Sequence, residues 1–186
     1  MFHSNTQRLI DVWQGQRNNG AGLPERAQIS PVAFGPLLPQ LFMLGGPAAG
    51  DEVFRLAGGF LADLHGRDLR GAEFCTLWSK PDRHRVIYAL TRARREAAPV
   101  VATADASTIS GETIGLEITL APLVGPTGEV DRIIGLYQPI SMTARLVGKP
   151  ISQLSLRQVD LIESNSAKPR ERSHLRLVAC NGLRVA

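Results

Sequence analysis

The residues that could bind a metal ion do not stand at metal-binding spacings. A two-histidine motif needs both histidines on one face of an element, with an acidic ligand nearby. The chain has four histidines, and no pair of them meets this requirement: His3, His65, His84 and His174. We therefore expect no metal site.

The residues that could carry catalysis are equally scattered. Segment 45–50 has the glycine gap of a phosphate-binding loop, but two acidic residues follow it where such a loop needs Lys and Ser or Thr, so it would repel an anion. Asp63, His65 and Ser79 could form a triad on paper, yet no Gly-x-Ser-x-Gly elbow surrounds any serine. The sequence thus carries no nucleotide loop and no hydrolase signature.

Length and composition indicate a small protein of a reducing compartment. The 186 residues suit one domain with an appendage. No stretch approaches the ~20 apolar residues of a membrane-spanning helix, and the N-terminus lacks the basic start and apolar run of a secretory signal. Cys75 and Cys180 are too few for a disulfide framework. We expect a cytoplasmic protein with no membrane partner.

The net charge of +4 raises the question of nucleic-acid binding. The arginines of segment 83–95 are spaced around a predicted helix and do not line one stripe. A second basic group lies near the C-terminus, without aromatic residues that could stack on bases: Lys168, Arg170, Arg172, Arg176 and Arg184. Both observations argue against nucleic acid as the partner.

Hydrophobic periodicity orders the first half of the chain. Three apolar residues share one face of an N-terminal helix: Leu9, Ile10 and Trp13. An extended connector punctuated by Gly and Pro leads to a short helical turn opened by Pro31. The apolar run 41–44 and the alternating segment 53–57 then predict the two strands of a hairpin.

The second half combines one long helix with a group of strands. Short helical pieces lead to segment 82–98, whose apolar residues recur every three to four positions. Three strand patterns follow, joined by short glycine-containing turns: 100–109, 114–124 and 130–138. Their apolar face needs the helices as a cover, so the sequence predicts a two-layer α+β fold. From residue 141 onward the pattern is mixed, which predicts a partly ordered, peripheral tail over 141–186.

Several short segments combine with this order of elements to suggest a family. They are Val12-Trp13, Leu23-Pro24-Glu25-Arg26, Ile29-Ser30-Pro31, Leu38-Pro39, Phe54-Arg55-Leu56-Ala57-Gly58 and Gly66-Arg67-Asp68-Leu69-Arg70-Gly71. The chain resembles the PAS-domain superfamily, and within it the short single-domain alphaproteobacterial proteins with a Trp-bearing N-terminal helix. The resemblance implies a five-stranded antiparallel sheet covered by short helices and one long helix, with an added N-terminal helix. Residues 1–30 would be that helix and its connector, 31–140 the PAS-like domain, and 141–186 the tail.

The resemblance suggests flavin or haem as a cofactor, and the residues at the relevant positions argue against both. Flavin-binding light sensors of this fold carry a reactive Cys preceded by Asn and followed by Arg and Gln. Cys75 lacks these neighbours, so a small buried hydrophobe is the simpler interpretation. Haem-binding members take an axial ligand from the long helix, but His84 stands between Arg83 and Arg85, which favours a surface position. The cofactor is unknown from the sequence.

The implied architecture leaves space for a ligand between the sheet and the long helix. Candidate wall residues come from the second strand, the helices and the last three strands: Phe54, Leu56, Phe60, Leu77, Trp78, Ile87, Tyr88, Thr91, Ile118, Leu120 and Tyr137. We expect most of them to be ordinary core as well. Arg55, a charge within an apolar strand, would need a carboxylate such as Asp68 or Glu73 if buried, or else an acidic ligand.

The apolar face of the N-terminal helix has two interpretations. Leu9, Ile10 and Trp13 either pack on the chain's own sheet or pair with a second copy, because an apolar patch with an aromatic anchor is typical of an interface. We expect a homodimer.

The function indicated by the resemblance is a non-enzymatic sensory and regulatory module of bacterial signal transduction. It would act through a small-molecule ligand, a signalling protein of kinase or cyclase type, or both. The alternative is a small cone-shaped α+β enzyme of isomerase or dehydratase type, with Glu117 and Tyr137 as its acid–base pair. Strand order separates the two, because the PAS arrangement places the first strand in the middle of the sheet, beside the last.

Overall fold

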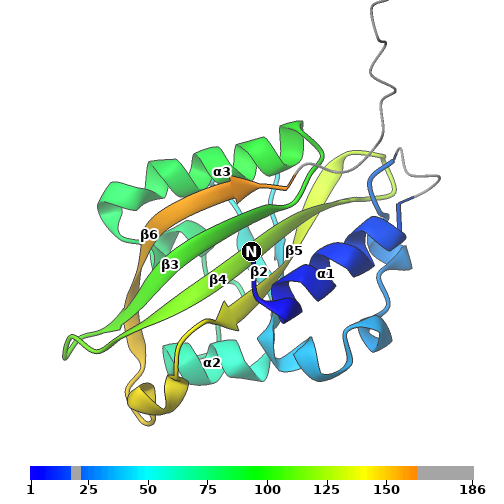
Figure 1. Cartoon of the computed structure of the whole chain (residues 1–186). Coiled ribbons are helices and arrows are strands. Elements are labelled where there is room, and N and C mark those ends of the chain that lie inside the picture. The colour runs from blue at the N-terminus through cyan, green and yellow to red at the C-terminus, as the bar shows by residue number, and fades with distance from the viewer. Residues whose placement is uncertain (18–21, 163–186) are drawn as a thin grey trace, which may run out of the picture.

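The computed structural model describes residues 1–17 and 22–162 as one antiparallel sheet with helices on both faces (Figure 1). The helices and strands are α1 Ser4–Gly15, β1 Leu41–Gly45, β2 Val53–Ala57, α2 Gly59–His65, α3 Arg83–Arg95, β3 Val100–Thr108, β4 Thr113–Val124, β5 Val130–Pro139 and β6 Ile151–Leu161. The 3₁₀ turns are η2 Arg26–Gln28, η3 Pro31–Ala33, η4 Gly35–Gln40, η5 Phe74–Leu77, η6 Lys80–Asp82 and η7 Thr143–Leu146. In the described part of the chain, no helix is both long and apolar enough to cross a membrane.

The strands lie in the order β2-β1-β5-β4-β3-β6, so β1 lies beside β5 in the interior of the sheet. Because β5 is the last of the five predicted strands, this is where the PAS resemblance places the first strand. The predicted hairpin, long helix and three-strand meander are all present. The prediction of five strands is wrong, because β6 adds a sixth at the β3 edge.

β6 lies in the segment predicted to be a peripheral tail. Its register against β3 shifts twice, and Ser152 and Arg157 have no β3 partner of their own. Each such bulge inserts one residue into the strand. The apolar residues therefore follow a spacing of three and two positions instead of strict alternation: Ile151, Leu154, Leu156, Val159 and Leu161. The two bulges conceal the strand from a periodicity argument, while residues 163–186 of the predicted tail lie outside the described part.

The main core lies between one face of the sheet, here called the inner face, and α2, η5 and α3. Phe42 of β1 is buried there beside Gly135 of β5, its partner in the adjacent strand. A methyl group at Gly135 would overlap the Phe42 ring. Glycine at this position therefore makes room for a central aromatic side chain.

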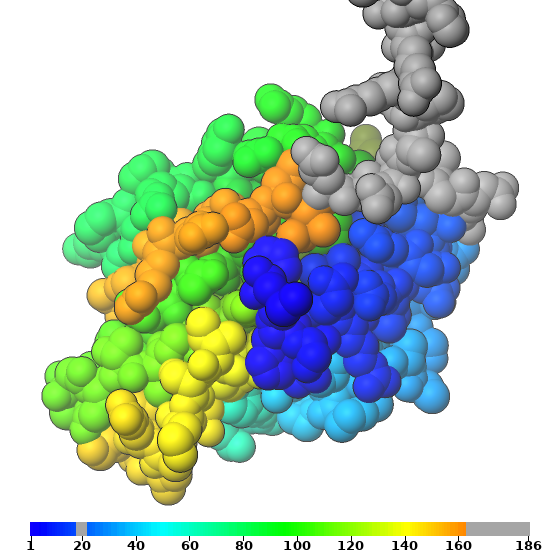
Figure 2. Space-filling view, in the orientation of Figure 1, coloured from blue at the N-terminus to red at the C-terminus, as the bar shows by residue number. Residues whose placement is uncertain are grey.

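A smaller core lies on the opposite, outer face, where α1 covers part of β4 and β5 (Figure 2). Leu9 and Ile10 are buried, and the indole N–H of Trp13 donates to the Pro122 carbonyl oxygen at 2.8 Å. The backbone N–H of His3 donates to the Glu117 carboxylate, which fixes the start of the helix. The expected interface residues are thus covered by the chain's own sheet, because α1 docks along it and buries its apolar stripe. A homodimer stays a prediction, and it would have to use another surface.

A buried ion pair ties α3 to the β1–β2 turn. Glu52 is fully buried, and its carboxylate accepts from the Arg94 guanidinium at 3.1 Å. Arg94 also donates to the Val130 and Gly46 carbonyl oxygens, while the Gly50 N–H donates to the other Glu52 oxygen. The pair therefore holds the helix, the hairpin turn and the start of β5 together.

Candidate functional site

Aromatic rings fill the interior between the inner face of the sheet, α2 and η5. The Phe42 ring lies 5.4 Å from that of Tyr137 and 5.9 Å from that of Phe74, between centroids. Phe74 in turn lies 5.9 Å from Trp78. His65, at the end of α2, has its ring centroid 6.0 Å from that of Tyr137. One continuous group of rings thus connects α2, η5 and the central strands.

Three polar atoms within this group have no hydrogen-bond partner among the described residues. They are His65 Nε2, Trp78 Nε1 and the Tyr137 hydroxyl oxygen. Trp78 and Tyr137 are at most 1% exposed, and His65 is 8% exposed. A buried polar group without a partner costs about 1–3 kcal/mol, so native proteins rarely leave several such groups in one core unless something else satisfies them.

Burial keeps these groups uncharged. Desolvation, and to a smaller extent the nearby Arg67 charge, lowers the pKa of His65 to about 4, so the imidazole is neutral at pH 7. Burial also raises the pKa of Tyr137, which keeps its hydroxyl protonated. The site therefore offers an indole donor, a phenol that donates or accepts, and a neutral imidazole.

The sequence profile of the PAS domain family matches residues 1–138. The chain belongs to the PAS domain family. PAS domains are in general sensory or regulatory modules and not enzymes.

Among solved structures, similarity extends to proteins of the light-oxygen-voltage (LOV) type. A LOV protein of Rhodobacter sphaeroides shares 12% identity, with 79% of this chain and 73% of that chain covered and a TM-score of 0.46. The dark structure of Aureochrome1 LOV shares 13%, with coverages of 60% and 83% and a TM-score of 0.45. An RNA-binding LOV receptor shares 17%, with coverages of 64% and 36% and a TM-score of 0.46. Similarity at this level carries no argument about function. No curated protein matches the chain.

The structure of this PAS domain divides the predicted wall residues into three groups. Six are buried in the main core: Phe54, Leu77, Trp78, Ile118, Leu120 and Tyr137. Two are partly buried against it: Phe60 and Ile87. Three are exposed, so their assignment to the interior is wrong: Leu56, Tyr88 and Thr91.

Leu56 leaves the interior because of a bulge in β2. Met43 of β1 faces Leu56 and Leu44 faces Phe54, so Arg55 is the extra residue. The bulge turns Leu56 to the outer face, where it lines an apolar hollow of about 120 Å³ with Met43. Strict alternation would have placed Phe54 and Leu56 on the same face.

Arg55 is exposed and therefore needs no buried partner. Asp68, one of its two predicted partners, pairs with Arg70 at 2.9 Å instead. No ion pair of Arg55 or Glu73 occurs among the described residues.

Tyr88 and Thr91 lie on the solvent side of α3 with His84, at three- and four-residue spacing. The buried side of that helix consists of small and aliphatic residues: Val86, Ala89, Leu90 and Ala93. His84 thus occupies the surface position that its flanking arginines favour. Cys75 is 7% exposed, and burial followed by the charge of Glu52 raises the pKa of its thiol to about 11, which makes it unreactive.

Sequence reasoning missed His65, Phe42 and Phe74 as members of the site. A signal for His65 was present, because Leu61, Leu64 and His65 stand at positions i, i+3 and i+4 of α2 and all are buried. The wall prediction took Phe60 from this helix, which is only partly buried.

The acid–base pair of the alternative enzyme is separated by the sheet. Ile118 of β4 faces Tyr137 of β5, and the next pair along the strands is Glu117 with Gln138. Since neighbouring residues of a strand point to opposite faces, Tyr137 lies in the main core and Glu117 on the outer face. Glu117 there accepts from the His3 backbone N–H. The two side chains cannot act on one substrate.

Proposed function

We propose that this PAS domain senses a small, uncharged molecule that binds in the interior beside Tyr137. The three unpartnered polar atoms of His65, Trp78 and Tyr137 support the proposal, because a ligand with hydrogen-bonding atoms would satisfy them. The ligand needs an acceptor for the Trp78 N–H. It is neutral because the three groups carry no charge at pH 7 and would leave a charged ligand unpaired.

The position of Tyr137 also supports a regulatory output. Tyr137 and its neighbour Leu136 point to opposite faces of β5, and Leu136 belongs to the outer core beneath α1 with Leu9 and Trp13. A ligand that displaces Tyr137 would therefore disturb the packing of α1. We propose that this change acts on a partner protein. A cytoplasmic role in bacterial signalling, a kinase-type or cyclase-type partner and a homodimer belong to this proposal.

Native mass spectrometry of the full-length protein, purified without denaturation, tests the proposal. The wild type should retain a small neutral compound, and Tyr137→Phe should lose it. Without ligand, Tyr137→Phe should be about 1 kcal/mol more stable than the ligand-free wild type, because the substitution removes an unpaired buried hydroxyl. Tyr88→Phe makes the same chemical change at the exposed tyrosine and should alter neither result. Retention of the same compound by Tyr137→Phe, or a wild type that carries no compound, would contradict the proposal.

A further inference from the structure

The two edges of the sheet are closed to different extents. At the β2 edge, the Phe54 N–H donates to the Ala72 carbonyl oxygen at 3.0 Å, and the Gly71 N–H donates to the Phe54 carbonyl oxygen at 2.8 Å. The Phe74 N–H donates to the Glu52 carbonyl oxygen at 2.9 Å. The segment after α2 thus covers the start of the β2 edge, at Glu52 and Phe54, as natural proteins commonly cover strands that could pair with other chains.

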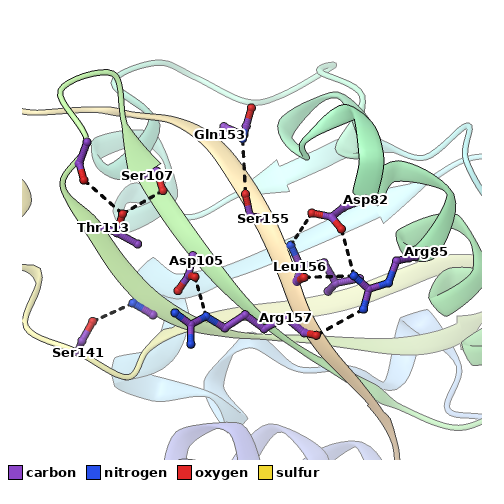
Figure 3. Close-up of polar contacts among 12 residues, drawn as sticks. Asp82, Arg85, Asp105, Ser107, Thr113, Ser141, Gln153, Ser155, Leu156 and Arg157 are labelled. Atoms are coloured by element: carbon purple, nitrogen blue, oxygen red, sulfur yellow. Dashed lines mark hydrogen bonds and ion pairs between the residues drawn. The ribbon is translucent and has the colours of Figure 1, made fainter.

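The first part of the β6 edge is closed by Ser79, by Asp82 of η6 and by Arg85 of α3, and Figure 3 shows the last two. The Ser79 N–H donates to the Leu154 carbonyl oxygen at 2.7 Å. The Leu156 N–H donates to the Asp82 carboxylate at 2.9 Å, and Arg85 donates to the Leu156 and Arg157 carbonyl oxygens. Both main-chain groups of Leu156 therefore face away from β3.

Beyond the bulge at Arg157, the same alternation exposes the end of the strand. Val159 is opposite Ala102 and Leu161 is opposite Val100, and these two β3 residues follow Ala104, the partner of Leu156, in steps of two. The main-chain groups of Val159 and Leu161 therefore point away from β3, as those of Leu156 do. The N–H of the next residue, Ile162, points toward β3 and donates to the Pro99 carbonyl oxygen, which agrees with this alternation. Within residues 1–17 and 22–162, no hydrogen bond to the outward groups of Val159 or Leu161 is present. We call these two residues the open edge.

The open edge borders a hollow that contains two arginines. Val159 and α3 border an open surface hollow of about 380 Å³, which is lined by His84, Arg85, Tyr88 and Arg92. Arg95 continues the same exposed side of the helix, and among the described residues it has no ion-pair partner. In Figure 2, β6 forms an orange band beside the green surface of α3. Two of these arginines are already paired, Arg85 with Asp82 at 3.1 Å and Arg92 with Glu96 at 2.9 Å, so Arg95 supplies the positive charge in excess beside the main-chain donors and acceptors of the open edge.

We propose that the open edge binds an acidic, extended segment of a partner protein by strand addition. The segment would exchange main-chain hydrogen bonds with Val159 and Leu161 and direct its carboxylates toward the α3 arginines. Charge selects this occupant. A second copy would bring its own α3 arginines against the same face, and segment 163–186 of this chain contains more Lys and Arg than Asp and Glu.

Fluorescence anisotropy with labelled model peptides tests the proposal on the full-length protein. A peptide of alternating Glu and Val should bind, and its affinity should fall as salt is raised. The same peptide with alternate amides N-methylated should not bind, nor should an alternating Lys and Val peptide. Equal binding of the acidic and basic peptides would overturn the proposal, as would failure of the acidic peptide to bind.

Two substitutions at one position separate the main-chain contact from the side chain. Val159→Pro removes the outward N–H and leaves the N–H groups that face β3, so the melting temperature should stay near that of the wild type while affinity falls about tenfold. Val159→Ala keeps the N–H and should bind like the wild type. Unchanged affinity of folded Val159→Pro would refute strand addition.

Charge and accessibility are checked separately. Arg95→Glu should weaken the acidic peptide about fivefold, whereas Arg145→Glu, an exposed arginine in η7, should have no effect. The Val159 and Leu161 amides should exchange rapidly with deuterium in free protein and slowly with peptide bound. Slow exchange without peptide would show that another part of the chain or a second copy already covers the edge, and would overturn the proposal.

Discussion

Replacing Trp13 with Ala should destabilise the folded chain by about 3–5 kcal/mol, because Trp13 docks α1 onto its own sheet. The side chain is 1% exposed and packs in the outer core with Leu9, Phe34 and Leu136. A buried tryptophan removes about 150–250 Å² from water, which at about 25 cal/mol per Å² sets an upper bound near 4–6 kcal/mol.

Trp13→Phe should separate packing from hydrogen bonding. Phe keeps most of the apolar contact but loses the 2.8 Å bond to the Pro122 carbonyl oxygen. That oxygen would then be buried without its donor, so we expect a loss of about 1–2 kcal/mol. The order of stability should be wild type, Trp13→Phe, Trp13→Ala.

Urea denaturation at several protein concentrations distinguishes this explanation from a dimer interface. If Trp13 packs within one chain, the midpoint of unfolding should fall equally at every concentration. Asp11→Ala, on the exposed side of α1, should change the free energy of unfolding by no more than about 0.5 kcal/mol. A Trp13 effect as small as that of Asp11→Ala, or one that vanishes at low protein concentration, would refute the reasoning.

Two further predictions concern buried ionisable groups. The pKa of His65 falls from 6.5 to about 4 on folding, so between these pH values the unfolded chain binds more protons than the folded chain. The free energy of unfolding should therefore decrease as pH is lowered through this range, by up to about 3 kcal/mol. His65→Gln should flatten this pH dependence in urea titrations, and an unchanged slope would contradict the assignment. Arg94→Met should cost about 3–5 kcal/mol because it leaves the fully buried Glu52 without its partner. Arg95→Met, at an exposed arginine of the same helix, should change the free energy of unfolding little, and adding Glu52→Gln to Arg94→Met should restore part of the lost stability. Equal effects of the two arginine substitutions in urea denaturation would count against the buried pair.

Local sequence was sufficient for the elements whose pattern is regular. The apolar spacing of 82–98 predicted α3, and alternation with glycine-containing turns predicted the β1–β2 hairpin and the β3–β5 meander. These succeed because a helix or strand with one buried face repeats its apolar residues at the period of its own geometry. The order of these elements and the short motifs carry the resemblance to PAS domains, and that resemblance implied the position of β1 beside β5.

Register and docking were decided by the tertiary structure. Bulges at Arg55 and in β6 change which face a residue occupies, and a single inserted residue leaves no clear mark in the sequence. The same limit applies to the apolar stripe of α1, because the sequence alone is compatible with packing on the chain's own sheet or on a second chain. Only the structure shows that the stripe packs on the outer face of β4 and β5. His65, Trp78 and Tyr137 are far apart in sequence, so their unpartnered polar atoms become a candidate site only after folding brings α2, η5 and β5 together.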